Sequence, residues 1–153
     1  MTAKEMMVGD FLTFKDCLED GNIITVEVAE IYETELLASI DGDGAFDRID
    51  ADDELVGIPL SPDFFLKNGF AHGEENELKD EYVFAENLKQ IPQTVAEYTF
   101  YKHPISGCDS LLRCWTKCKD GDGQNDVHIC NLRYVHELQH AFRLLGIVKD
   151  FRP

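Results

Sequence analysis

The chain has 153 residues, of which 44% are hydrophobic and 10% aromatic, so it can bury the core of one ordinary domain or of two small subdomains. Thirty Asp and Glu residues against fourteen Lys and Arg residues give a formal net charge of -16, which repels nucleic-acid phosphates and anionic membrane surfaces. This charge excludes a conventional DNA- or RNA-binding protein, and we expect no direct contact with nucleic acid or membrane.

The negative charge is concentrated in the first half of the chain. Residues 1–70 hold seventeen acids and four bases, whereas residues 71–153 hold thirteen acids and ten bases. The first half is therefore expected to present an electronegative surface.

The cysteines and the first residues indicate the compartment. The cysteines form an odd set, and the first residues lack the basic, apolar and small-residue order of a signal peptide. No apolar run approaches the ~20 residues needed to cross a bilayer. We expect a cytoplasmic protein with reduced thiols at Cys17, Cys108, Cys114, Cys118 and Cys130.

Residues 1–60 consist of short apolar runs separated by acidic turns. The run 23–31 is rich in β-branched residues, and alternation places Ile24, Val26 and Val28 on one face of a strand. Five such runs predict a small acidic β module, either a barrel or a strongly curved sheet of SH3-like size. The runs are 10–14, 23–31, 35–40, 45–49 and 54–58.

A connecting helix is predicted within residues 61–70. Ser61 suits the N-cap, Pro62 suits the first helical position, and Asn68-Gly69 provide a left-handed stop. A polar loop is expected next, at residues 73–77.

Residues 71–153 are predicted to form an antiparallel β region with a C-terminal helix. Strand-like runs occupy 81–85 and 97–101, and the runs 111–118 and 127–132 form a hairpin around an acidic loop. An amphipathic helix within 133–147 is expected to cover this hairpin. The fold class is therefore α+β, and residues 71–153 are expected to form one compact unit or part of one.

Three segments of the chain resemble a group of small proteins encoded by Bacteroidetes-type gut anaerobes and by their phages. The segments are Met7-Val8-Gly9-Asp10-Phe11-Leu12-Thr13-Phe14, Ile58-Pro59-Leu60-Ser61-Pro62 through Lys67-Asn68-Gly69-Phe70, and Arg133-Tyr134-Val135-His136-Glu137-Leu138-Gln139-His140 through Gly146-Ile147. The group has no established activity. The resemblance therefore implies a cytoplasmic protein linked to phages or mobile elements, and it implies no catalytic residue.

The C-terminal helix contains the H-E-x-x-H pattern of zinc hydrolases. In such enzymes two histidines one turn apart bind zinc, the glutamate acts as base, and a third protein ligand is required. His136, Glu137 and His140 have this spacing, but the extended metalloprotease motif has His at the position of Gly146. Asp150 is the sole acid after His140.

The helical register weakens the zinc interpretation further. Leu138, Phe142 and Leu145 share one side of the helix, whereas His136, His140 and Arg143 lie nearly opposite. We expect the histidines to face away from the core as a surface pair. Arg143 beside them is expected to lower their affinity for a cation by repulsion.

Other patterns typical of metal sites are incomplete. The pattern Cys114-x3-Cys118 is not the C-x2-C knuckle of structural zinc sites, so buried, reduced thiols are expected. The segments 120–126 and 41–44 imitate the start of a calcium loop, but Asn125 and Ala45 replace the required turn glycine. We assign no catalytic, cofactor-binding or metal-binding residue from the sequence.

The acidic N-terminal half carries the functional hypothesis. We expect a non-enzymatic interaction or accessory protein whose acids bind a basic protein partner, and the alternative is a zinc-dependent hydrolase that uses residues 136–140. The sequence does not fix the oligomeric state. The acids concerned are Glu19, Asp20, Asp41, Asp43, Asp47, Asp50, Asp52, Asp53 and Glu54.

Overall fold

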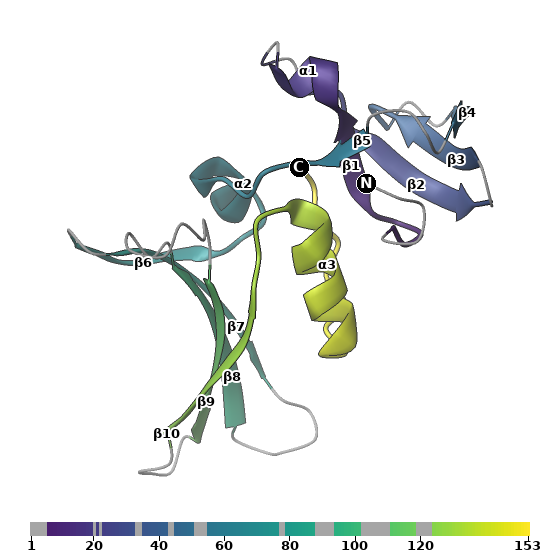
Figure 1. Cartoon of the computed structure of the whole chain (residues 1–153). Helices are drawn as coiled ribbons and strands as arrows, with labels where there is room; N and C mark the ends of the chain where they lie inside the picture. The colour runs from purple at the N-terminus through teal and green to yellow at the C-terminus, as the bar shows by residue number, and fades with distance from the viewer. Residues whose placement is uncertain are drawn as a thin grey trace. The chain divides into compact units, whose positions relative to one another are not determined.

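The computed structural model has a mixed α+β fold with two antiparallel sheets (Figure 1). It describes residues 6–19, 21, 23–32, 35–42, 45–50, 55–76, 79–87, 94–101, 111–118 and 124–153. The chain forms two compact units. Unit 1 comprises Met1–Pro59, Tyr134–Phe151 and Pro153, and unit 2 comprises Leu60–Arg133 and Arg152.

Unit 1 contains a five-stranded antiparallel sheet in the order β4-β3-β2-β1-β5. Each of the five predicted runs overlaps one of these strands. Within the described residues, β4 and β5 are the two edges of the sheet, so its closure into a barrel stays a prediction. The strands are β1 (Phe11–Phe14), β2 (Val26–Ile31), β3 (Glu35–Ile40), β4 (Phe46–Asp50) and β5 (Leu55–Gly57).

The inner face of this sheet forms an aliphatic core. Val26 and Val28 of β2 are buried on the same side, as the alternation predicted, and Leu36 of β3 and Leu12 of β1 join them. A short helix, α1 (Lys15–Glu19), follows β1 directly and was not predicted. Its five residues are too few for a recognisable apolar period.

Unit 2 contains the other five strands as a meander in the order β10-β9-β8-β7-β6. Two predicted loops are wrong in part: β6 extends through residues 73–76, and β10 begins at Gln124. In both places polar residues continue the strand through pairing with the neighbouring strand. The strands are β6 (Ala71–Asn76), β7 (Lys79–Asn87), β8 (Thr94–Tyr101), β9 (Leu111–Cys118) and β10 (Gln124–Asn131).

The connecting helix α2 (Pro62–Lys67) belongs to unit 2 and has the predicted caps. The Ser61 hydroxyl accepts a hydrogen bond from the Phe64 N–H at 3.2 Å, and Gly69 has a φ of 75°. Phe65 packs into an aromatic core, with its ring centroid 4.8 Å from that of Tyr82 and 5.1 Å from that of Phe100.

The C-terminal helix α3 (Val135–Leu144) groups with unit 1, whereas it was predicted as part of the C-terminal β region. The Val135 N–H donates to the Ile58 carbonyl at 2.9 Å, which ties the start of the helix to the chain after β5. Its end is a Schellman motif, in which Gly146 has a φ of 72° and the Ile147 N–H donates to the Phe142 carbonyl at 2.9 Å. Pairing with a segment distant in sequence is not visible in a local pattern, so the sequence could not predict this contact.

Candidate functional site

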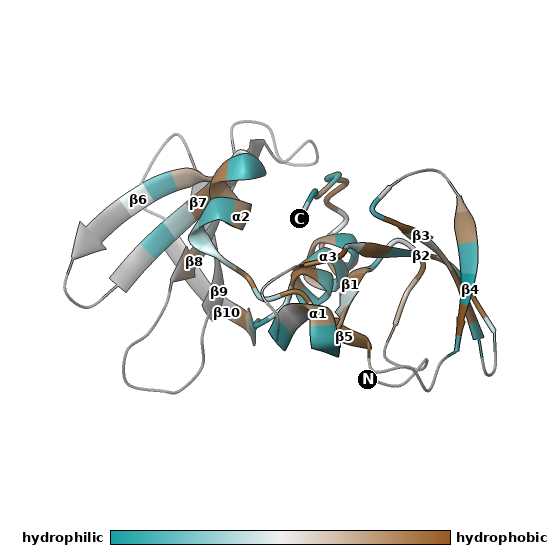
Figure 2. Cartoon of the chain, turned by 90° about the horizontal axis from the view of Figure 1, so that it is seen from above, coloured by the Kyte–Doolittle hydropathy of each residue, from teal (hydrophilic) through white to brown (hydrophobic). Residues whose placement is uncertain are grey.

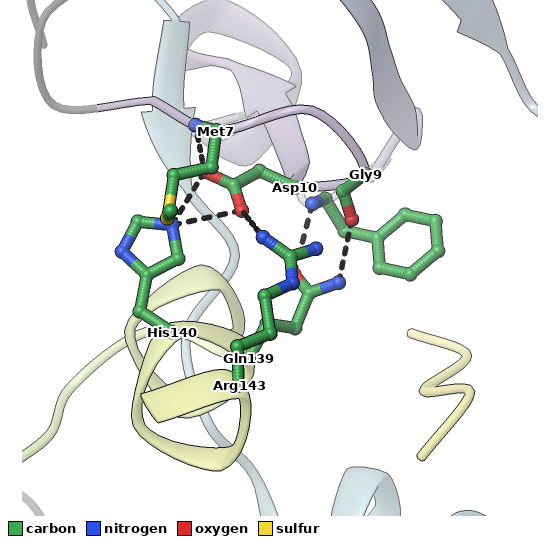
Figure 3. Close-up of polar contacts among 7 residues, drawn as sticks. Met7, Gly9, Asp10, Gln139, His140 and Arg143 are labelled. Carbon is green, nitrogen blue, oxygen red and sulfur yellow. Dashed lines mark hydrogen bonds and ion pairs between the residues drawn. The ribbon is translucent and has the colours of Figure 1, made fainter. Parts of the chain in front are cut away.

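The polar side of α3 meets the turn that precedes β1, and the fully buried Asp10 is the centre of this contact (Figure 3). Nε2 of His140 lies 2.9 Å from each carboxylate oxygen of Asp10. Nη1 of Arg143 lies 3.1 Å from Oδ1, and the Met7 N–H donates to Oδ2 at 2.7 Å. The buried carboxylate is therefore balanced by donors from both the helix and its own turn.

Gln139 makes a second connection between the same two segments. Its Oε1 accepts from the Phe11 N–H at 3.1 Å, and its Nε2 donates to the Gly9 carbonyl at 2.7 Å (Figure 3). The amide thus makes the two backbone hydrogen bonds that a residue of a neighbouring strand would otherwise make at the start of β1. This satisfies two backbone groups that are otherwise costly to bury.

The expectation that the histidines face away from the core as a surface pair is wrong. His136 is 5% exposed, and the side chain of His140 is 24% exposed. The register correctly placed them opposite Leu138 and Phe142, but that side is also covered. The turn at residues 7–10 contacts His140, and the ring of His136 lies against Tyr134 and Gly57. Arg143 is not an isolated cation either, because its guanidinium is paired with Asp10.

The ring of His136 is held between Tyr134 and β5. The two rings are stacked, with centroids 5.7 Å apart and an interplanar angle of 10°. A Cβ built on Gly57 would lie 2.5 Å from Cγ of Tyr134 and 2.7 Å from Cε1 of His136. Only glycine permits this close approach of both rings to the strand backbone.

Beside these rings lies an open groove of about 460 Å³. It is bounded by the edge strand β5 and by the first turns of α3. All three residues of the H-E-x-x-H pattern reach it, so the pattern lines a concave surface. The lining residues are Leu55, Val56, Gly57, Tyr134, His136, Glu137 and His140.

Glu137 has a structural contact that bears on its predicted role as a base. Its Oε2 accepts a hydrogen bond from the Tyr134 N–H at 3.2 Å, the backbone half of a capping box at the start of α3. Within the part of the chain that the structure describes, no group of three or more His, Cys, Asp or Glu side chains is placed to hold a metal ion. The third ligand of a zinc hydrolase is not identified among these residues.

The remaining predicted metal patterns are only partly described. Cys108, the segments 43–44 and 119–123, and the side chains of Cys114 and Cys118 lie outside the described residues. Cys17 is a partly buried free thiol, and Cys130 is partly buried. Asp41 is a turn residue with a φ of 52°, and its carboxylate accepts from the Thr25 N–H at 2.9 Å.

Strand register brings several of the acids of unit 1 onto one surface, which the sequence list alone could not show. Paired residues of antiparallel strands share a face. The pairs Glu27–Ser39, Ser39–Phe46, Glu30–Leu37, Leu37–Arg48 and Glu35–Asp50 therefore lie on the face opposite the core. We call this the outer face of β2–β4. Asp47 pairs with the buried Ala38 and belongs to the other side.

Comparison of the chain with protein-family models, curated proteins and solved structures found no match. In the described part of the chain, no helix has the length and apolar character required to span a membrane.

Proposed function

We propose that this protein is a non-enzymatic interaction or accessory protein that binds a basic protein partner through the outer face of β2–β4. The observation that carries the proposal is the charge on this face. Four carboxylates, those of Glu27, Glu30, Glu35 and Asp50, share it with the guanidinium of Arg48. Such an excess of one sign steers a partner of opposite charge and fixes its orientation.

Two exposed aromatic rings lie next to these acids and supply contact area. Phe46 is 58% exposed and Tyr32 is 48% exposed. Aromatic residues are enriched in the centres of protein interfaces because they bury much apolar area with few rotatable bonds. Figure 2 shows hydrophilic and hydrophobic residues along β4, in keeping with an edge strand of mixed character.

The environment of Tyr32 fits the same surface. Its hydroxyl donates a hydrogen bond to Glu30, and this bond, together with the charge of the carboxylate, raises the pKa of Tyr32 above its ordinary value. The phenol therefore stays neutral at physiological pH and adds no further negative charge. Arg48 bonds Glu35 at 2.9 Å, which illustrates how a guanidinium from a partner would engage this face.

A zinc-dependent hydrolase remains the competing proposal, because His136, Glu137 and His140 line one groove. The interaction proposal has the better support, since Oε2 of Glu137 already accepts the hydrogen bond from the Tyr134 N–H that caps α3. Metal analysis of protein purified without a His tag, combined with assays for hydrolysis, separates the two. Stoichiometric zinc together with peptidase or esterase activity, both lost in His140→Ala, would favour the hydrolase.

The interaction proposal is tested by reversing charge on the outer face. Immobilised wild-type protein is exposed to host lysate at low and high salt, alongside a variant with Glu27→Lys and Asp50→Lys. The matched control carries Asp16→Lys and Glu19→Lys, two exposed acids of α1 that give the same change in net charge. We expect the outer-face variant to retain at least tenfold less of the basic partner than wild type.

The control variant should retain the partner, and high salt should release it because surface charges are screened over about 10 Å at 0.1 M salt. Failure to enrich any basic protein at low salt would contradict the proposal. Equal loss in the two variants would show that net charge, and not the outer face, governs binding.

A further inference from the structure

We propose that His136 and His140 form a two-histidine site for a divalent transition-metal ion of the Zn²⁺ or Ni²⁺ class, with Asp10 orienting one of the ligands. The site lies in the groove beside β5. The two histidines supply two ligands, and water would occupy the remaining coordination positions. The inference is independent of the outer face of β2–β4 and needs no catalytic role for Glu137.

The spacing of the two rings suits a shared ion. The histidines are one helical turn apart on α3, and their ring centroids are 5.8 Å apart with an interplanar angle of 74°. Two imidazoles that share a tetrahedral ion at metal–nitrogen distances of about 2.0–2.1 Å have centroids about 5 Å apart. The observed separation of 5.8 Å is close to this spacing, so a small side-chain rearrangement brings the two rings to the separation that a shared ion requires.

Asp10 fixes the proton and the orientation of His140. A buried carboxylate accepts hydrogen bonds, so the Nε2 atom that lies 2.9 Å from both of its oxygens carries the proton. The ring nitrogen that can coordinate an ion is therefore Nδ1. Figure 3 shows this second nitrogen on the side of the ring away from Asp10. A carboxylate that bonds the far nitrogen of a ligating histidine is a recurrent feature of metal sites and increases the basicity of the ligand.

His136 is held in place before any ion arrives. Its ring is stacked on Tyr134, and its Cε1 edge abuts the backbone of Gly57. Its Nδ1 is buried, so the proposal assigns Nε2 as the ligand atom. Immobilising a side chain on binding costs entropy, and a ring already confined by its neighbours avoids most of that cost.

The local charges tolerate a cation. Arg143, which the sequence placed beside the histidines as a repelling charge, is paired with Asp10 at 3.1 Å. The carboxylate of Glu137 also lines the groove and contributes negative potential there. Imidazole ligands suit Zn²⁺ and Ni²⁺, whereas Mg²⁺ and Ca²⁺ prefer oxygen, so the latter two are expected to bind weakly.

Calorimetric titration of the untagged full chain with Ni²⁺ tests the affinity. His136→Gln and His140→Gln each remove a ligand but keep a polar side chain, and we expect each to weaken binding at least tenfold. His72→Gln is the control, because it removes an exposed histidine of unit 2. Near-UV circular dichroism establishes that each variant is folded. A saturating ion should also raise the melting temperature of wild type and of the control, but not of the two site variants.

Long-range ¹H–¹⁵N spectra of the histidine side chains with Zn²⁺ identify the ligand atoms. We expect metal-dependent shifts at Nε2 of His136 and Nδ1 of His140, and none at His72. Asp10→Asn is expected to lower affinity about 10- to 100-fold. Equal Ni²⁺ affinity in wild type and both site variants would overturn the proposal, as would shifts absent from these two rings. Unchanged affinity in Asp10→Asn would overturn the orienting role of Asp10.

Discussion

The two sides of α3 are both largely withdrawn from solvent, but by different interactions. Leu138 and Phe142 are 0% and 1% exposed on the apolar side, and Gln139 is 6% exposed on the polar side. Phe142 packs against Phe151 with ring centroids 5.1 Å apart, whereas Gln139 bonds the backbone of the turn before β1.

This difference shows what an amphipathic pattern can and cannot reveal. The pattern identifies which residues share a side, and it identifies the side that buries apolar surface. It does not state that the polar side meets water. In this protein the polar side binds another segment through specific hydrogen bonds. Substitutions on the polar side and on the apolar side should therefore lower the free energy of unfolding by different amounts.

The largest effect is expected on the apolar side. Phe142→Ala should lower the free energy of unfolding by about 3–5 kcal/mol, because it removes a buried ring and leaves a cavity beside Phe151. Urea denaturation followed by circular dichroism measures the change. A loss below about 1 kcal/mol would show that the apolar side does not anchor the helix.

The next largest loss of stability is expected when the buried carboxylate of Asp10 is removed. Removal of one partner of a buried ion pair costs about 3–5 kcal/mol, and Asp10→Ala should cost about 2–3 kcal/mol because His140 and Arg143 keep some contact with water. The same denaturation experiment in the Asp10→Ala and Arg143→Ala double mutant should show a cost less than the sum of the single changes. Strict additivity would mean that the two side chains do not interact in solution.

Of the three substitutions, Gln139→Ala should lower the free energy of unfolding the least, by about 1–2 kcal/mol. The substitution leaves the Phe11 N–H and the Gly9 carbonyl without their side-chain partner, although both groups are near enough to the surface to recruit water. Hydrogen exchange of the Phe11 amide provides a local readout, and its protection should fall more than that of β3. Leu144→Ala on the same helix is the reference, since that side chain is 88% exposed and its loss should change stability by less than about 0.5 kcal/mol.

The elements that depend on local chemistry were predictable from the sequence. Ser61, Pro62 and Gly69 define the caps of α2, and the alternation through Val26 and Val28 defines the inner face of β2. The H-E-x-x-H spacing also correctly placed His136 and His140 one turn apart. Each of these features involves residues within a few positions of one another, where propensity and periodicity act directly.

The parts that were not predictable depend on contacts between distant residues. Nothing near Asp10 in the sequence indicates that His140 and Arg143 will meet its carboxylate, and nothing near Gly57 indicates that two rings will cover it. The outer face of β2–β4 likewise requires the register of three strands, including the irregularity between Val28 and Glu30, which a list of acids does not contain.

The arrangement of unit 1 in the sequence has a consequence for how the protein is made. Residues 60–133 interrupt this unit, and the Leu60 N–H donates to the Arg133 carbonyl at 2.9 Å where the interruption begins and ends. On the ribosome, the strands of residues 1–59 emerge long before α3 does, so Asp10 and Gly57 lack their helical partners until residues 134–151 have been synthesised. Unit 2 is contiguous through Arg133 and has no such delay. Unit 2 is therefore expected to fold first even though its strands are synthesised second.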